Sequence, residues 1–182
     1  MPFEKSFNKA CVLTHKKRPR SVITISLIIA KDVVKNVIQI RPIGVIHSGF
    51  KRREDVPRKG PISYHAIGEI EIFKDYEKGL KDIEGFSHLV VLWIFHRSKE
   101  YRLLVEPLAY KGEMGVFATC HPDRPNPIGV TVVELIDRNK NRLSVKGVDM
   151  VDGSPVVDIK PYVRAYVREN IRLGWLENAE AR

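Results

Sequence analysis

The sequence predicts a mainly β protein, an all-β barrel or sandwich with short helical turns. Two observations favour this class. Seven or eight short apolar segments follow one another between residues 40 and 162, and turn-forming residues such as glycine, proline and asparagine punctuate them. Helical periodicity is weak by comparison, since Asp75–Gly85 suggests a helical turn at most.

The length and charge bound the possible classes further. The 182 residues are enough for one domain with an adequate core, with or without a tail. We expect residues 1–39 to be an N-terminal extension, disordered or accessory, and residues 40–182 to form the β domain with a C-terminal tail. The 31 Lys and Arg residues outnumber the 22 Asp and Glu residues, and the formal charge of +9 favours a polyanionic partner such as a nucleic acid.

The cysteines and the apolar runs bear on the compartment. Cys11 and Cys120 give no disulfide framework, which favours a reducing compartment. The longest apolar run, Val22–Ala30, is shorter than the roughly 20 residues of a membrane span. It follows basic residues, as in a secretory signal, but no small-residue cleavage pattern comes after it. We therefore expect a cytoplasmic protein without a membrane segment.

The first half of the β domain contains three predicted strands. Ile40–His47 begins the series, and the basic loop Gly49–Gly60 follows it. That loop is either a solvated turn or a clamp for phosphate or another anionic group. Ile67–Phe73 alternates apolar and acidic residues, as a half-buried strand does. His88–Phe95 is a continuous apolar run, as expected of a strand that is covered on both faces.

The second half contains the remaining predicted strands, which are Leu103–Pro107, Met114–Thr119, Gly129–Asp137, Arg142–Met150 and Val156–Ile159. In the fourth of these, a two-residue period places Leu143 and Val145 on the apolar face. The same period assigns Gly147 and Asp149 to that face. Asp149 would then point inward at the end of the strand, where a carboxylate needs a partner.

Two stiff polar loops stand out among these strands. Residues 115–130 hold three prolines within six positions, and each proline fixes φ and pushes the residue before it toward an extended conformation. Residues 148–162 set acidic side chains around a glycine and two prolines. Both are either parts of a site on a rigid scaffold or tight connections with solvated charges. Arg124 would either serve a substrate or pair with Asp152 or Asp158 to lock the loops together.

Residue spacing disfavours three kinds of site. His88 and His96 are eight positions apart, roughly 26 Å along an extended strand, and no CxxC, HxxxH or HExxH pattern occurs, so no metal is expected. Cys120 and His121 are adjacent, and neighbouring strand residues face opposite ways, so a Cys nucleophile is not expected. Neither GxGxxG nor GxxxxGK[ST] is present, which disfavours a Rossmann or P-loop site.

Several segments together resemble the TsaA-like (TrmO-type) family. The most specific are MGVFAT with RPNPIG, within residues 114–129, and DMVDGSPVVDIKPY at 149–162. Shorter matches are IGVIHS (43–48), VPR (56–58), GEIEI (68–72) and GFSHLVVLWIFH (85–96). The resemblance covers roughly residues 40 to 162. It implies a compact single-sheet β-barrel that pairs as a homodimer.

The resemblance also implies an activity: S-adenosylmethionine-dependent methylation of tRNA, on the exocyclic nitrogen of the threonylcarbamoyladenosine beside the anticodon. The cofactor-binding positions that it suggests are Pro57, Arg58, Lys59, His96, Arg97, Cys120, Val130, Gly147, Val148 and Asp149. Asp149 would accept hydrogen bonds from the adenine amine or the ribose hydroxyls of the cofactor. Cys120 stands where bacterial members carry an arginine. We expect the chain to lack the second small domain that follows this segment in those members.

The two loops supply the candidate residues for the acceptor. Asn126-Pro127 is similar to the Asn-Pro turn that Rossmann-type amino methyltransferases aim at an exocyclic amine, an analogy across different folds. The candidate catalytic residues are Arg124, Asn126 and Asp152, and the candidate tRNA-binding residues are Arg124, Lys160 and Tyr162. The alternative function is a non-catalytic module of the same fold that binds S-adenosylmethionine or RNA.

Overall fold

The computed structural model describes residues 38–57, 63–107 and 110–179, so that nearly all of the predicted N-terminal extension lies outside the described residues. The strands are β1 (Gly44–His47), β2 (Ile67–Ile72), β3 (His88–Ile94), β4 (Leu104–Val105), β5 (Met114–Gly115), β6 (Ile128–Asn139), β7 (Arg142–Lys146) and β8 (Pro155–Pro161). The 3-10 helices are η1 (Arg53–Asp55), η2 (Ser63–His65), η3 (Lys74–Leu80), η4 (Ile83–Gly85), η5 (Val116–Ala118) and η6 (Arg164–Tyr166), and one α-helical turn, α1 (Leu176–Ala179), follows.

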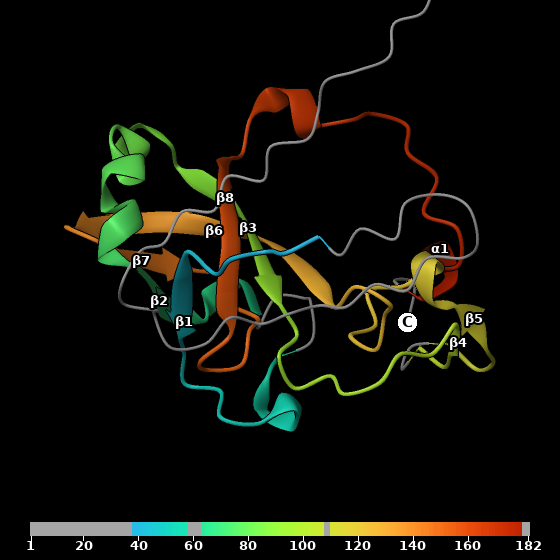
Figure 1. Ribbon diagram of the computed structural model, residues 1–182. Helices are drawn as coiled ribbons and strands as arrows, with labels where there is room; N and C mark the ends of the chain where they lie inside the picture. The colour runs from blue at the N-terminus through green and yellow to red at the C-terminus, as the bar shows by residue number, and fades with distance from the viewer. Residues whose placement is uncertain (1–37, 58–62, 108–109, 180–182) are drawn as a thin grey trace, which may run out of the picture.

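Six of the strands form one antiparallel sheet that closes on itself (Figure 1). They pair in the cyclic order β1-β2-β7-β6-β3-β8, and β8 returns to β1 at two residue pairs. β4 and β5 form a separate two-stranded ribbon. The expectations of a mainly β protein with short helical turns are therefore confirmed.

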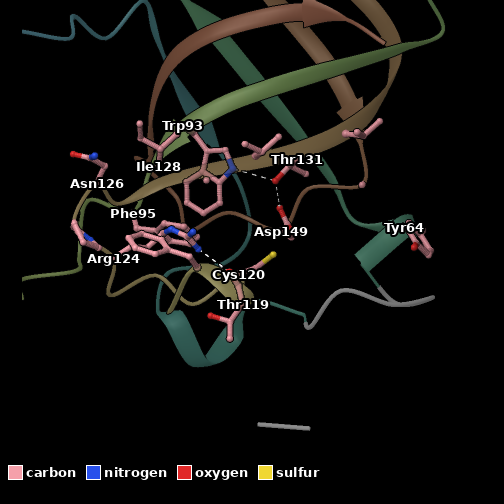
Figure 2. Close-up of a pocket in the computed structure, with 16 residues that line it drawn as sticks. Tyr64, Trp93, Phe95, Thr119, Cys120, Arg124, Asn126, Ile128, Thr131 and Asp149 are labelled. Carbon is pink, nitrogen blue, oxygen red and sulfur yellow. Dashed lines mark hydrogen bonds between the residues drawn. The ribbon is translucent and has the colours of Figure 1, made fainter. Parts of the chain in front are cut away.

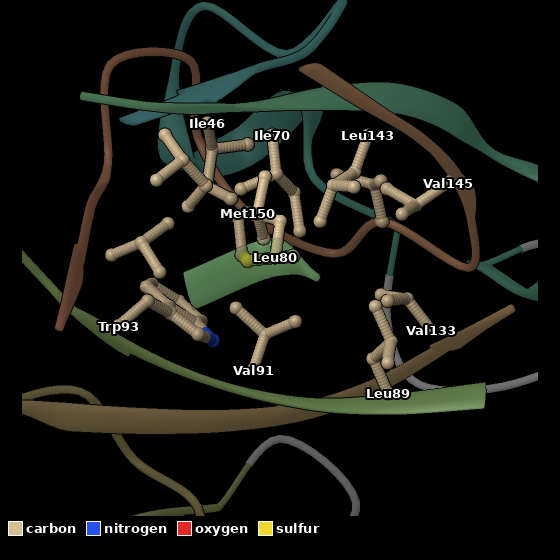
Figure 3. Close-up of a cluster of buried hydrophobic side chains, with 13 residues drawn as sticks. Ile46, Ile70, Leu80, Leu89, Val91, Trp93, Val133, Leu143, Val145 and Met150 are labelled. Atoms are coloured by element: carbon tan, nitrogen blue, oxygen red, sulfur yellow. The ribbon is translucent and has the colours of Figure 1, made fainter. Parts of the chain in front are cut away.

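The core fills the inside of the closed sheet (Figure 3). Alternate residues of each strand point inward, among them Ile70 of β2, Leu89 of β3 and Leu143 of β7, and all three are fully buried. Leu80 of η3 is 4% exposed and joins the same cluster. Burial of each such side chain contributes about 1.5–3 kcal/mol. An exposed ion pair on the outer face contributes at most about 1 kcal/mol, so the apolar interior holds the fold.

The prediction that β3 is covered on both faces is wrong. Burial alternates along the strand: Leu89 and Val91 are buried, whereas Val90 and Leu92 are only partly buried. A closed antiparallel sheet has one inner face, and nearby outer side chains of β6 remain exposed, including Val130. The continuous apolar run of β3 therefore reflects a partly covered outer face.

The predicted two-residue period of the Arg142–Met150 segment is also wrong beyond β7. Leu143 and Val145 point inward as expected, but the next buried residues are Val148 and Met150. The phase changes at Gly147, whose φ of +95° lies in the left-handed region that favours glycine. The strand ends there, and the turn carries Asp149 out of the hydrophobic core.

The predicted strand Met114–Thr119 ends early as well. Only Met114 and Gly115 pair with β4, and the chain then forms the η5 turn. The amide of Thr119 donates to the carbonyl of Val116 at 3.2 Å, which closes that turn. The first polar loop therefore begins with a compact helical turn.

Candidate functional site

A cavity of about 950 Å³ opens where β3 ends and β6 begins (Figure 2). Its lining comes from the ends of these two strands, from Gly147 and Asp149 of the turn after β7, from residues between Phe117 and Asn126 of the first polar loop, and from Tyr64 of η2. Aromatic rings, including Trp93 and Phe95, supply much of its wall. The two loop segments that stood out in the sequence therefore meet at one cavity.

A chain of hydrogen bonds fixes the carboxylate of Asp149 at this cavity (Figure 2). Trp93 Nε1 donates to Thr131 Oγ1 at 3.0 Å, and the Thr131 hydroxyl donates to Asp149 Oδ1 at 2.6 Å. Trp93 is 5% exposed and Thr131 is 6% exposed, so both groups depend on these partners. The chain sets the orientation of the carboxylate before any ligand binds.

The position of Trp93 depends on a glycine across the sheet. Gly129 is its partner on β6, and a Cβ atom at Gly129 would lie 2.3 Å from the nearest atom of the indole. The ring therefore packs flat against the backbone of β6, which brings Nε1 to Thr131.

The edge of β6 that faces away from β3 borders the cavity at Val130 and Val132. The Phe95 amide donates to the Pro127 carbonyl at 2.8 Å, which marks a hydrogen-bonded pair between β3 and the start of β6. Bonded and non-bonded pairs alternate in an antiparallel ladder. The amides and carbonyls of Val130 and Val132 therefore point away from β3, toward the opposite edge.

On that opposite edge, β7 pairs with β6 only from Glu134 onward. After Lys146 the chain turns at Gly147, and the Gly147 amide donates to the Ala66 carbonyl at 2.8 Å instead of continuing along β6. Within the described ranges, no strand pairs with the two valines on this side. The gap offers backbone donors and acceptors to a flat polar ligand.

The opposite wall of the cavity is built from the first polar loop. Arg124 Nη1 donates to the carbonyl of Thr119 at 2.8 Å, which ties the proline-rich segment to the η5 turn. The alternative that Arg124 locks the loops by pairing with Asp152 or Asp158 is wrong, because those carboxylates pair with Lys51 and with Lys160. The guanidinium of Arg124 belongs to the cavity wall.

Six of the predicted site residues line the cavity: Cys120, Arg124, Asn126, Val130, Gly147 and Asp149. Figure 2 shows Asn126 on one side of the Trp93 and Phe95 rings and Asp149 on the other, while the Arg124 side chain runs beside the Phe95 ring toward Thr119. The structure thus separates Asn126, a predicted acceptor residue, from the carboxylate predicted for the cofactor.

The remaining predicted cofactor residues lie outside this cavity or outside the described chain. Val148 is fully buried in the core. His96 follows Phe95 of the cavity wall, and its Nδ1 lies 3.3 Å from the hydroxyl of Ser154. Burial lowers the pKa of His96, and the charge of Arg97 lowers it further. Pro57 is partly buried and does not line the cavity, and Arg58 and Lys59 lie outside the described residues.

Asp152, predicted to be catalytic, has a different environment. Its Oδ1 accepts the amide of Ser48 at 3.0 Å, and its Oδ2 accepts the ammonium of Lys51 at 2.8 Å. The hydrogen bond from Lys51 holds the pKa of Asp152 below its usual value. The carboxylate fastens the basic loop after β1 to the second polar loop, and the structure does not bring it to the cavity.

Two predicted tRNA-binding residues lie at the other end of β3. Lys160 pairs across the sheet with Val90, and the Tyr162 amide bonds to the His88 carbonyl. At about 3.3 Å per residue, these positions lie roughly 15–25 Å along the sheet from Phe95, and Lys160 is about 10 Å from Val132, the lining residue in its row two strands away. Lys160 is paired with Asp158 at 2.6 Å, which raises the pKa of the ammonium.

Several lining residues were not identified from the sequence, including Tyr64, Trp93, Phe95, Phe117 and Thr131. The sequence feature that could have identified Thr131 is a polar residue among the apolar residues of a predicted strand. Its importance depends on the register that places it beside Trp93, and strand periodicity does not specify register.

Two further findings concern the described part of the chain. No group of three or more His, Cys, Asp or Glu side chains there is arranged to hold a metal ion. None of its helices is both long enough and apolar enough to span a membrane.

Curated relatives of this chain carry two kinds of name. A protein of Pyrococcus abyssi called a probable S-adenosyl-L-methionine-binding protein is 50% identical over 146 residues, which are 80% of this chain and 79% of that one. The Escherichia coli tRNA (adenine(37)-N6)-methyltransferase is 41% identical over 135 residues, 69% of this chain. This match spans 57% of the E. coli protein, somewhat more than half its length.

Solved structures that resemble this chain include crystal structures of TrmO. The crystal structure of TrmO from Pseudomonas aeruginosa matches with a TM-score of 0.64 and 35% identity, over 75% of this chain and 61% of that one. A second TrmO crystal structure matches with a TM-score of 0.65 and 36% identity, over 75% and 63% of the two chains. The family model of the tRNA-methyltransferase O N-terminal domain matches residues 45–167, so the chain belongs to the TrmO family.

Proposed function

We propose that this chain is an S-adenosylmethionine-dependent tRNA methyltransferase that acts on the exocyclic nitrogen of the threonylcarbamoyladenosine beside the anticodon. The observation that carries the proposal is the hydrogen-bonded chain Trp93–Thr131–Asp149 beside the edge of β6 at Val130 and Val132, with which no strand of the described residues pairs. It holds a carboxylate in a cavity whose walls are largely aromatic and apolar. A nucleoside ligand needs this combination of an apolar slot and a few fixed polar groups.

The cofactor fits this part of the cavity in three respects. Asp149 can accept hydrogen bonds from the adenine amine or the ribose hydroxyls. The backbone groups of Val130 and Val132 can donate to and accept from the edge of a purine. The volume of about 950 Å³ falls within the roughly 300–1,000 Å³ of small-molecule sites.

The protein has two tasks in the reaction that we propose. S-adenosylmethionine, when bound, supplies an activated methyl group, so the chain has to orient the acceptor nitrogen and let its proton leave. We assign the first task to Asn126 and Arg124, since both line the cavity and Asn126 lies on the side away from Asp149. The side-chain carbonyl of Asn126 accepts the N–H of the acceptor, and water at the open mouth takes the released proton.

Asp152 then acts as a positioning residue. Its two oxygens hold Ser48 and Lys51, at the start of the basic loop that leads to Pro57. We expect its replacement to release that loop and to weaken cofactor and tRNA binding without removing a reacting group.

The test is nucleoside mass spectrometry of tRNA after incubation with the protein and a methyl-labelled cofactor. We expect label in threonylcarbamoyladenosine and none in tRNA that lacks this nucleoside. Arg124→Ala and Asn126→Ala should lower turnover about 100-fold, as misplacement of a reacting group does, with cofactor affinity near that of the parent. Lys74→Ala, which changes an exposed residue of η3, is the control. Full turnover by both site variants would move the acceptor site elsewhere.

A specific observation favours the second candidate, a non-catalytic module that binds S-adenosylmethionine or RNA. Archaeal relatives, including those of Pyrococcus abyssi and Archaeoglobus fulgidus, are named for S-adenosylmethionine binding alone. Cys120 lines the cavity at the position where the bacterial pattern predicts an arginine, and a thiol cannot make the paired contacts of a guanidinium. Cofactor binding by calorimetry without methyl transfer to any tRNA would establish this candidate.

The homodimer that the resemblance implies remains a prediction. Val130, Val132 and Ile136 are exposed apolar side chains along β6, and a second copy of the chain can cover them. Light scattering measures the mass in solution, and Ile136→Lys, which leaves the cavity lining unchanged, should shift a dimer toward monomer.

A further inference from the structure

The turn that carries Phe117 is anchored firmly although the ring of Phe117 is exposed. Val116 is fully buried, and its amide donates to the Leu103 carbonyl at 2.9 Å. The Thr119 hydroxyl donates to the Val116 carbonyl at 2.9 Å. Phe117 lies between these two residues and is 75% exposed at the cavity. The fixed backbone on both sides of Phe117 therefore keeps its ring exposed to solvent.

The C-terminal tail anchors the same turn from another side. Trp175 Nε1 donates to the Ala118 carbonyl at 2.8 Å, and the Trp175 ring meets Tyr110 edge-on with centroids 6.1 Å apart. Figure 1 shows the tail running down to α1, which is drawn above the ribbon of β4 and β5. Two distant parts of the chain thus fix the backbone next to Phe117. Single exposed apolar side chains are common on protein surfaces, so what distinguishes this ring is its fixed place in the cavity lining.

The position of the ring in the cavity indicates which ligand covers it. Thr131, beside Asp149, is nearly inaccessible to solvent, whereas Phe117 is mostly exposed. A small cofactor can reach the interior, but an RNA has to approach from solvent and can insert only a base. The exposed ring therefore faces the macromolecular substrate.

Positive charge accompanies the ring. The guanidinium of Arg124 lines the cavity together with Phe117. Close by, the Asp123 carboxylate lies 3.9 Å from His121 Nδ1 and 3.8 Å from Arg53 Nη1, so the charge of Arg53 is partly compensated. Arg124 is tied to the Thr119 carbonyl in the same wall as Phe117. Cations beside an exposed aromatic ring are the features with which proteins hold single-stranded RNA, through phosphate contacts and base stacking.

We propose that Phe117 is a base-stacking residue, whose ring packs against the unpaired acceptor nucleobase of the RNA at the mouth of the cavity. The inference rests on the proposed function and adds a specificity element to it. Stacking holds the base flat, so that its exocyclic nitrogen faces the Asn126 side of the cavity.

The test compares Phe117→Leu, which keeps apolar bulk without a π-face, with Phe117→Trp, which keeps the π-face. The probe is an anticodon stem-loop RNA with adenosine next to the anticodon, and its affinity is measured by fluorescence anisotropy with cofactor present. Phe117→Leu should weaken binding about five- to 150-fold, the range known for loss of a stacking ring, and Phe117→Trp should stay close to the parent. Tyr101→Ala, at a 62% exposed aromatic residue outside the cavity lining, should change little.

An abasic version of the same RNA isolates the contact. With no base to stack on, Phe117→Leu and the parent should bind it equally. Equal losses on intact and abasic RNA, or a loss of cofactor affinity in place of RNA affinity, would overturn the proposal. Circular dichroism checks that each variant folds; Phe117→Met replaces the leucine variant, and Phe117→Tyr the tryptophan variant, where either does not.

The outcomes distinguish failure of the proposed function from failure of the stacking proposal. If the parent transfers no methyl group but loses RNA affinity on Phe117→Leu only when the base is present, the proposed function fails and the stacking residue stands. If the parent methylates tRNA and Phe117→Leu changes neither RNA affinity nor kcat/KM, the stacking proposal fails alone.

Discussion

Replacement of Thr131 by valine tests the hydrogen-bonded chain that holds Asp149. Valine keeps the shape of threonine but removes the hydroxyl, so the Trp93 N–H loses its acceptor and Asp149 Oδ1 loses a donor at 2.6 Å. A stranded buried donor costs about 1–3 kcal/mol, and we expect the free energy of unfolding to fall by that amount. Cofactor affinity should fall about tenfold, because Asp149 loses one of the groups that orient its carboxylate.

Urea denaturation followed by tryptophan fluorescence measures the first effect, and calorimetry with S-adenosylmethionine measures the second. Thr131→Ser is the matched control, since it keeps the hydroxyl and loses only a methyl group, worth about 0.8 kcal/mol. Its cofactor affinity should equal that of the parent. If the valine variant is as stable as the parent and binds the cofactor as tightly, the chain of hydrogen bonds does not organise the site.

Three further predictions follow from the structure. Gly129→Ala places a Cβ 2.3 Å from an atom of the Trp93 ring, so the indole has to move and the melting temperature should fall by the equivalent of about 1–3 kcal/mol; an unchanged value would mean that the ring adjusts freely. Burial lowers the pKa of both His96 and His121, so the unfolded chain binds more protons than the folded chain as the pH falls below about 6.5. The free energy of unfolding should therefore decline through that range and level off below the folded-state pKa values. Urea midpoints at pH 7.5 and 5.5 measure the decline, which should be smaller in the variant with glutamine at both positions. A chain that begins at Val37 should keep its fold and its cofactor affinity, since β1 begins at Gly44 and the family match at residue 45; aggregation or a large drop in melting temperature would assign the removed segment to the core.

Much of the sheet could be predicted because strand periodicity is a local property of the sequence. The alternation in β2 gave the inward face of Ile70 and Ile72, and the apolar run at His88–Phe95 gave β3. The errors occurred where a single residue changes the backbone course. Gly147 takes a positive φ and shifts the phase of every residue after it, which a fixed two-residue period cannot anticipate.

The site was predictable in part for a related reason. The stiff segments around Asn126 and Asp149 were recognisable from prolines and clustered charges, and both reach the cavity. Asp152 has the same sequence signature, but a tertiary contact with Lys51 turns it to the far side of its loop. Phe117 was not predicted, since an exposed ring and a buried one look alike in an apolar segment.

The open edge of β6 at Val130 and Val132 makes the solubility of the protein depend on the concentration of its cofactor. In the part of the chain that the structure describes, no strand pairs with the backbone of Val130 and Val132 on this side, and an open edge of this kind is a template to which an extended segment of another chain can add. A bound nucleoside that occupies those groups removes the template, and at a hundred times its Kd it also stabilises the fold by about 2.7 kcal/mol. Starvation for the cofactor would therefore leave the protein less stable and with an exposed edge open to aggregation.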